Sequence, residues 1–84
     1  MSEKEILTRL KKIVEPYVQS LEGLQNFKEE TDFLNDLQIN SANLVDVILD
    51  VEDEFNIEID NDSMEGMLTV GDAKAIIQRK LPQG

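Results

Sequence analysis

The stretch SANLVDVILDVEDEF, residues 41–55, predicts an amphipathic helix around which the fold is organised. At about 100° per residue, five of its apolar side chains gather on one face, which should belong to the core. These are Leu44, Val47, Ile48, Val51 and Phe55. A smaller apolar group lies on another face and consists of Ala42, Val45 and Leu49. The acids around it are Asp46, Asp50, Glu52 and Asp53. An apolar patch ringed by acids favours a surface for a partner, although Val45 and Leu49 could instead widen the core face.

The sequence before this helix predicts a first helix and a long ordered loop. Ser2 and Glu5 fit a capping box, and apolar residues at helical spacing extend the first helix over residues 3–18. Pro16 should kink or end its last turn. Residues 19–39 are too apolar for a linker and should be pinned to the core. The expected anchors are Leu21, Leu24, Phe27, Phe33, Leu34, Leu37 and Ile39.

The sequence after residue 55 predicts one short and one longer helix. A short helical turn is expected near residues 61–66, and Thr69 with Asp72 fits a second capping box. The last helix then runs to Leu81 and is ended by Pro82 and Gly84. The predicted fold is all-α: a four-helix bundle with three main helices, one short helix and a long first loop, in a single domain over residues 1–84.

Composition and charge exclude several classes of function. The 84 residues contain no Cys and no His, which excludes thiolate zinc sites and the usual Cys–His and Ser–His–Asp arrangements. The net charge is −10, and the acids concentrate in residues 31–65, because no base lies between Lys28 and Lys74. Such a segment repels nucleic acid and anionic lipid and attracts proteins with basic patches. The chain also cannot form disulfides, turns charged at once after Met1 and has no apolar run long enough to cross a bilayer. We expect a cytoplasmic monomer that does not bind nucleic acid or insert into a membrane.

Ser41 stands at the start of the predicted acidic helix, where we expect its hydroxyl to be exposed and firmly held. A serine in that place suits covalent attachment, whereas the plainer interpretation is that Asn40 or Ser41 only caps the helix. No metal site is expected. A calcium loop beginning at Asp60 is broken by Met64, and a loop beginning at Asp50 lacks the required glycine.

The segment DLQINSANLVD, residues 36–46, resembles the attachment motif of acyl carrier proteins. That family typically has an acid–Leu pair, two further residues, and then Asp-Ser-Leu at the start of its second helix. The resemblance continues without gaps from about residue 31 through the acidic helix to the last helix. Residues 1–30 match in character, as a first helix followed by a long loop.

The resemblance implies that Ser41 carries 4′-phosphopantetheine through a phosphodiester bond, and that the thiol of this arm holds acyl groups as thioesters. It implies a carrier, not an enzyme, that is modified by a phosphopantetheinyl transferase and serves fatty acid, lipid or polyketide-type biosynthesis. Partner enzymes with basic patches should contact Asp36, Asn40, Ala42, Val45, Asp46, Leu49, Asp50, Glu52 and Asp53. The interior that could shelter an acyl chain comprises Leu44, Ile48, Val51, Phe55, Ile59 and Met67.

Three positions depart from the family pattern. Asn40 stands where the family usually has Asp, Ala42 where it usually has Leu, and Leu44 where it is often polar. These changes indicate a specialised member and alter what a transferase meets beside Ser41. The changes at Asn40 and Ala42 also support an alternative, an unmodified acidic helical adaptor with the carrier fold. A calcium-responsive helical module is a third hypothesis, which the missing loop glycine weakens.

Overall fold

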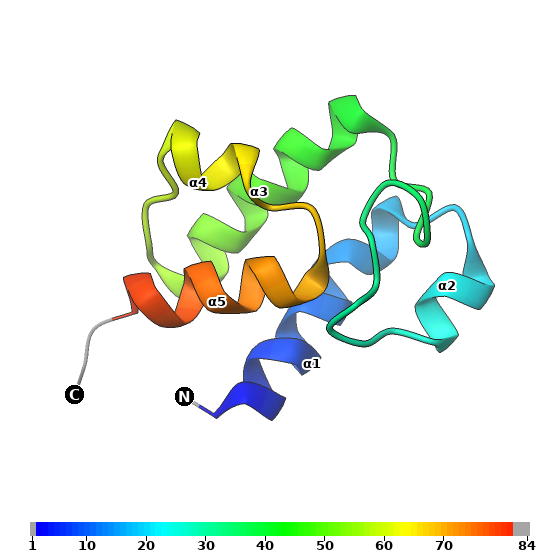
Figure 1. The fold of residues 1–84 in the computed structure, drawn as a ribbon, viewed down its shortest axis with the longest axis horizontal. Helices are drawn as coiled ribbons and strands as arrows, with labels where there is room; N and C mark the ends of the chain where they lie inside the picture. The colour runs from blue at the N-terminus through cyan, green and yellow to red at the C-terminus, as the bar shows by residue number, and fades with distance from the viewer. Residues whose placement is uncertain (1, 82–84) are drawn as a thin grey trace.

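The computed structural model describes residues 2–81, and within that range the regular elements are helices (Figure 1). They are α1 (Glu3–Val14), a 3₁₀ turn η1 (Glu15–Tyr17), α2 (Leu21–Gln25), α3 (Ser41–Phe55), α4 (Asn61–Glu65) and α5 (Val70–Lys80). α1 packs against both α3 and α5, and Figure 1 shows α2 at one end of the molecule. The predicted all-α bundle with three long helices is confirmed. None of the helices in residues 2–81 combines the length and apolar character that a membrane span requires.

The later helices begin where the sequence predicted. α3 covers the predicted range and ends at Phe55, and the residue after it, Asn56, adopts a left-handed conformation with φ of 55°. At the start of α5, the Thr69 hydroxyl accepts a hydrogen bond from Asp72 N at 3.2 Å, and the Asp72 carboxylate accepts one from Thr69 N at 3.1 Å. This is the predicted capping box, and α4 occupies the predicted short turn. Pro82 and Gly84, expected to end the last helix, lie outside the described residues.

The first helix is shorter than predicted. α1 ends at Val14, not at residue 18, and the chain continues as the 3₁₀ turn η1. The reason is Pro16, which has no backbone N–H to donate to the helix and clashes with the preceding turn. At the other end, Ser2 caps α1 by accepting a hydrogen bond from Glu5 N at 3.1 Å.

The loop before α3 contains a helix that the sequence analysis missed. Ser20 opens α2 by accepting a hydrogen bond from Gly23 N at 3.2 Å, and Gly23 lies directly against the carbonyl of Asp36. Two of the expected anchors are wrong, since Leu21 and Leu34 are 74% and 39% exposed. The other five expected anchors are buried in the core or packed against it: Leu24, Phe27, Phe33, Leu37 and Ile39.

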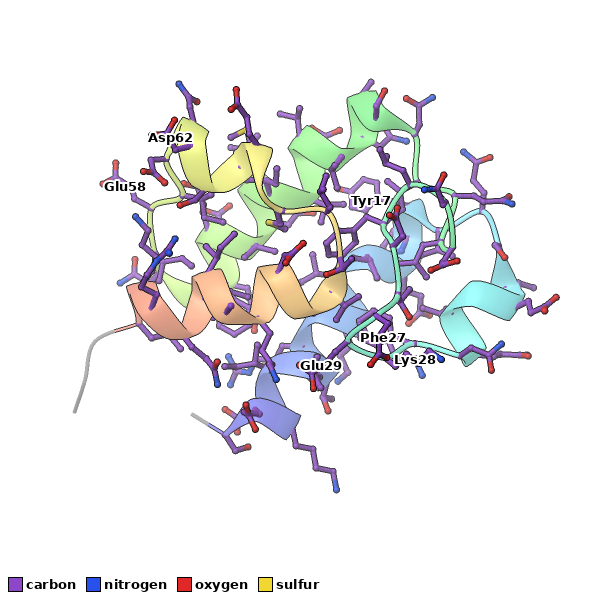
Figure 2. The ribbon with its side chains drawn as sticks, viewed as in Figure 1. Tyr17, Phe27, Lys28, Glu29, Glu58 and Asp62 are labelled. Carbon is purple, nitrogen blue, oxygen red and sulfur yellow. The ribbon has the colours of Figure 1, made fainter. Side chains whose placement is uncertain are left out.

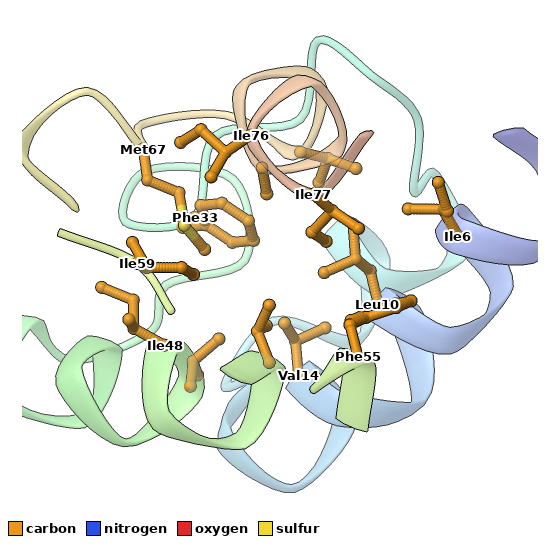
Figure 3. Packing of buried hydrophobic residues seen from close by; sticks show 14 of the residues in the cluster. Ile6, Leu10, Val14, Phe33, Ile48, Phe55, Ile59, Met67, Ile76 and Ile77 are labelled. Carbon is orange, nitrogen blue, oxygen red and sulfur yellow. The ribbon is translucent and has the colours of Figure 1, made fainter. Parts of the chain in front are cut away.

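One hydrophobic core joins the three long helices and the loop, and Figure 3 shows its packing. Leu10 of α1, Val51 of α3 and Ile77 of α5 are fully buried in it, and Phe33 enters from the loop. Helices as short as these are marginal alone in water, so this shared core supplies most of their stability.

Backbone hydrogen bonds join the loop to the start of α5. Phe33 N donates to Leu68 O at 3.1 Å, and Val70 N donates to Thr31 O at 2.9 Å. We call these two bonds the loop–α5 bonds. They fix the segment that leads into α3 against a helix far away in the sequence.

A buried lysine reinforces the same junction. Lys74 of α5 is only 8% exposed, and its Nζ lies 3.1 Å from Glu3 of α1 and also contacts Glu29 of the loop. The hydrogen bonds to Glu29 and Glu3 raise the pKa of Lys74 above its ordinary value. The backbone also takes part, because Gly71 N donates to Glu29 O at 2.8 Å.

Candidate functional site

Ser41 is the first residue of α3, and its side chain is exposed. Asn40 performs the capping: it has extended backbone angles, and its Oδ1 accepts a hydrogen bond from Ala42 N at 2.8 Å. Among the described residues, no hydrogen bond engages the Ser41 hydroxyl. The structure thus separates the two roles that the sequence left open, with Asn40 as the cap and Ser41 beside it with a free hydroxyl at the positive end of the helix dipole.

The segment before Ser41 is held in place by its buried neighbours. Leu37 and Ile39 are buried, and Ile39 N donates to Phe33 O at 3.0 Å. Between them, Gln38 has φ of 56°. This left-handed conformation is energetically unfavourable for any residue that has a Cβ atom. The start of α3 is therefore fixed by core contacts, at the expense of local strain three residues before Ser41.

The outward face of α3 exposes an apolar patch. Val45 is 49% exposed and Leu49 is 52% exposed, and Ala42 is exposed beside them. The structure therefore places these side chains outside the core. Asp46, Asp50 and Asp53 are also exposed on α3, while Glu52 is half-buried.

The carboxylates predicted to contact partners differ in what they already bind. Glu52 Oε2 accepts a hydrogen bond from Ile59 N at 2.8 Å, which fixes the chain after α3. Asp36 Oδ2 accepts one from Asp32 N at 2.8 Å, within the loop. Asp46 and Asp53 make no hydrogen bond or ion pair through their side chains within residues 2–81.

Tyr17 is a neighbour of α3 that the sequence analysis did not associate with the site (Figure 2). Its hydroxyl donates to Asp50 Oδ2 at 2.8 Å, and this hydrogen bond raises the pKa of Tyr17 above its ordinary value. No local pattern signals this contact, because Tyr17 and Asp50 are 33 residues apart in the sequence.

The predicted acyl shelter is part of the core. Five of its six residues are buried, and the sixth, Leu44, is packed against the cluster. Figure 3 shows Ile48, Ile59 and Met67 together, facing Ile76 of α5. No group of three or more acidic residues in the described part of the chain is arranged to hold a metal ion.

Comparisons with known proteins agree on one family, although no protein-family model matches the chain. It is 40% identical over 78 residues to the acyl carrier protein of Lactobacillus acidophilus, covering 93% of this chain and 95% of that protein. It is 36% identical over 80 residues to the acyl carrier protein of Prochlorococcus marinus, covering 95% and 98% of the two chains.

A solved structure gives the same result. The acyl carrier protein from Enterococcus faecalis superposes with a TM-score of 0.76 and 26% identity, over 95% of this chain and 99% of that chain. The chain therefore belongs to the acyl carrier protein family, whose members bear a phosphopantetheine group and are carriers in fatty acid biosynthesis rather than enzymes.

Proposed function

We propose that Ser41 is the attachment point of 4′-phosphopantetheine in this chain and that the arm carries acyl groups as thioesters. The observation that carries the proposal is the division of roles at the start of α3. Because Asn40 supplies the cap, the Ser41 hydroxyl is exposed and uncommitted. A phosphodiester formed on it would lie near the positive end of the α3 dipole, which favours an anion.

The exposed face of α3 is the proposed surface for partner enzymes. Val45 and Leu49 provide an apolar contact, and the carboxylates of Asp46, Asp50 and Asp53 provide attraction for basic side chains. No Lys or Arg lies between Lys28 and Lys74 in the sequence to compete with a partner for these carboxylates. The partners would be a phosphopantetheinyl transferase and enzymes that transfer or modify acyl chains.

We propose that the chain is a single domain and that its hydrophobic core shelters the bound acyl chain. One cluster contains Ile48, Val51, Phe55, Ile59 and Met67, so an acyl chain that entered it would be removed from water and surrounded by apolar side chains. Loading with a medium-length acyl group should then raise the melting temperature above that of the form bearing the bare arm. An unchanged melting temperature would indicate an acyl chain exposed to solvent.

The attachment is tested by intact-mass measurement after incubation with coenzyme A, Mg²⁺ and a broad-specificity transferase. The wild type should gain one phosphopantetheine and Ser41→Ala none. Ser63→Ala is the matched control and should gain one phosphopantetheine, like the wild type. The Ser63 hydroxyl already accepts a hydrogen bond from Arg79 at 3.1 Å, and we do not expect it to be an attachment point. Loading of Ser41→Ala would place the arm elsewhere, and failure of the wild type with several transferases would favour the unmodified adaptor.

A variant of Asn40 extends this experiment. Asn40→Asp keeps an oxygen that can accept from Ala42 N and adds a negative charge beside Ser41. If the transferase engages that position through basic groups or Mg²⁺, Asn40→Asp should load faster than the wild type. An equal rate would show that the charge at this position does not limit recognition.

A further inference from the structure

A polar pocket, which we call the α2–loop pocket, lies between α2 and the loop that leads into α3. Its volume is about 640 Å³, and it is open to solvent. Side chains from both elements line it, among them Ser20, Asn26, Asn35 and Gln38. The volume falls within the range of ligand pockets. The hydroxyl and amide groups suit a ligand that forms hydrogen bonds rather than an acyl chain.

Backbone contacts hold the two sides of the α2–loop pocket together. Gly23 of α2 lies directly against the carbonyl of Asp36 in the loop. Gln19 N and Ser20 N both donate to Leu37 O, at 3.1 and 3.3 Å. Leu37 itself is fully buried in the core. The pocket is therefore built into the fold, so little conformational entropy is lost when a ligand enters it.

Two amide side chains in the pocket are available to a ligand. Asn35 and Gln38 are exposed, and neither side chain makes a hydrogen bond within residues 2–81. By contrast, Asn26 Nδ2 already donates to Glu22 O at 3.0 Å. Gln38 also has the left-handed backbone, with φ of 56°. Strain of this kind clusters at binding and switch sites, so Gln38 is the first candidate for a binding residue.

The α2–loop pocket lies within reach of Ser41. Gln38 precedes Ser41 by three residues, so their Cα atoms are at most about 11 Å apart. Figure 1 shows the loop rising from α2 to the start of α3. An extended phosphopantetheine arm is longer than this span. Because a tethered ligand has a high effective concentration, weak contacts are enough to bind it.

The charge of the pocket determines which part of the arm fits. The pantetheine portion is uncharged, and its amide N–H and C=O groups match the donors and acceptors of side-chain amides. The phosphate does not fit, because the charged residues of the lining are three carboxylates and one lysine: Glu22, Glu30, Asp36 and Lys28. The phosphate would remain at the positive end of the α3 dipole while the pantetheine portion enters the pocket.

We propose that the α2–loop pocket binds the arm when it bears no acyl group, with Gln38 and Asn35 as the hydrogen-bond partners of its amides. The proposal rests on the proposed function, because it requires the arm on Ser41. An acylated arm leaves the pocket, since burial of an acyl chain in the core outweighs the net gain from a few hydrogen bonds. The pocket and the core are then two alternative positions of one arm, and the cargo selects between them.

Isotope-filtered NMR of the loaded chain tests the position of the arm. An isotope-labelled chain is loaded from unlabelled coenzyme A, which leaves the thiol of the arm free of acyl groups. Nuclear Overhauser effects between the unlabelled arm and the labelled protein then report their contacts. The bare arm should contact Gln38, Asn35 and Gly23. Contacts with α3 and α4 alone, or no contacts at all, would overturn the proposal.

Variants of Gln38 test the role of its amide. Gln38→Ala should lower the ratio of bound to unbound arm by about fivefold, as expected for the loss of one hydrogen bond. The ratio is measured from the amide shift changes between the apo and loaded forms at Gly23 and Asn35. Gln38→Asn keeps an amide and tolerates the left-handed backbone, so it should retain most of the binding. The matched control is Gln25→Ala on α2, outside the pocket, which should leave the ratio unchanged.

The outcomes separate this proposal from the proposed function. If the wild type loads and Gln38→Ala matches Gln25→Ala, the pocket proposal is overturned and the carrier function stands. If a medium-length acyl group is then placed on the arm, the pocket contacts should disappear, and their persistence would contradict the selection by cargo. If the wild type does not load with any transferase, the proposed function fails and the pocket loses its role with it.

Discussion

Replacing Gly23 by alanine should force α2 away from the loop that leads to Ser41. A Cβ atom at this position would collide with the carbonyl oxygen of Asp36 and lie 2.8 Å from its carbon. These are backbone atoms, so no flexible side chain can move aside. Relief requires a shift of α2 or of the loop.

The cost has two parts. Overpacking against a fixed neighbour costs about 1–3 kcal/mol. A shift would also strain the hydrogen bonds from Gln19 N and Ser20 N to Leu37 O, at 3.1 and 3.3 Å, each of which contributes about 1 kcal/mol. We expect Gly23→Ala to lower the free energy of unfolding by about 3 kcal/mol and the melting temperature by roughly 12–24 °C.

Thermal and urea unfolding followed by far-ultraviolet circular dichroism measure this directly. Gly66→Ala is the matched control, since an added Cβ at Gly66 meets nothing nearer than 3.7 Å and φ there is −86°. It should be neutral or stabilise by about 0.5 kcal/mol, because alanine restricts the unfolded chain. Equal stability of the two variants would refute the reasoning that the close approach of Gly23 and Asp36 fixes α2.

Three further predictions concern strain, ionisation and charge. Gln38→Gly should stabilise the protein by about 0.5 kcal/mol, because relief of the left-handed strain exceeds the entropy cost of glycine; a lower urea midpoint would contradict this. Tyr17 is the only tyrosine, so its absorbance titration reports one group: its pKa should exceed the ordinary value, and Asp50→Asn should bring it down. Since the pKa is raised in the folded state, the stability from this hydrogen bond is present below the unfolded pKa, near 10, and is lost as pH rises through the folded value. Finally, the melting temperature should rise from low to moderate salt, because the acids of residues 31–65 have no base among them; a salt-independent value would show that their repulsion is negligible.

The parts of the fold predicted from the sequence are those with a strong local pattern. α3 has fifteen residues with a regular apolar face, and Thr69 and Asp72 form a cap whose atoms are three residues apart. α2 has five residues, too few for a period, and it is held by the contact between Gly23 and Asp36. No local pattern reports that contact, so the helix was missed.

The same division applies to the candidate site. The position of Ser41 and the exposure of Val45 and Leu49 follow from a motif and a helical period. The hydrogen bonds of Asp50 and Glu54 do not, because their partners come from another element: Tyr17 is 33 residues from Asp50, and Arg9 is 45 residues from Glu54. Such pairs depend on how α1 packs on α3, which composition and spacing leave undetermined.

The loop–α5 bonds have a consequence for how carriers of this kind diverge. They use main-chain atoms, which every residue type except proline supplies in full, so the bond from Phe33 N to Leu68 O does not depend on the side chain of Leu68. Leu68, for example, contributes its carbonyl while its side chain is 56% exposed. A substitution of Leu68 by another residue can therefore change the exposed surface next to α5 without breaking the bond that holds the loop before α3. Related carriers can therefore acquire different partners while Ser41 stays in the same place.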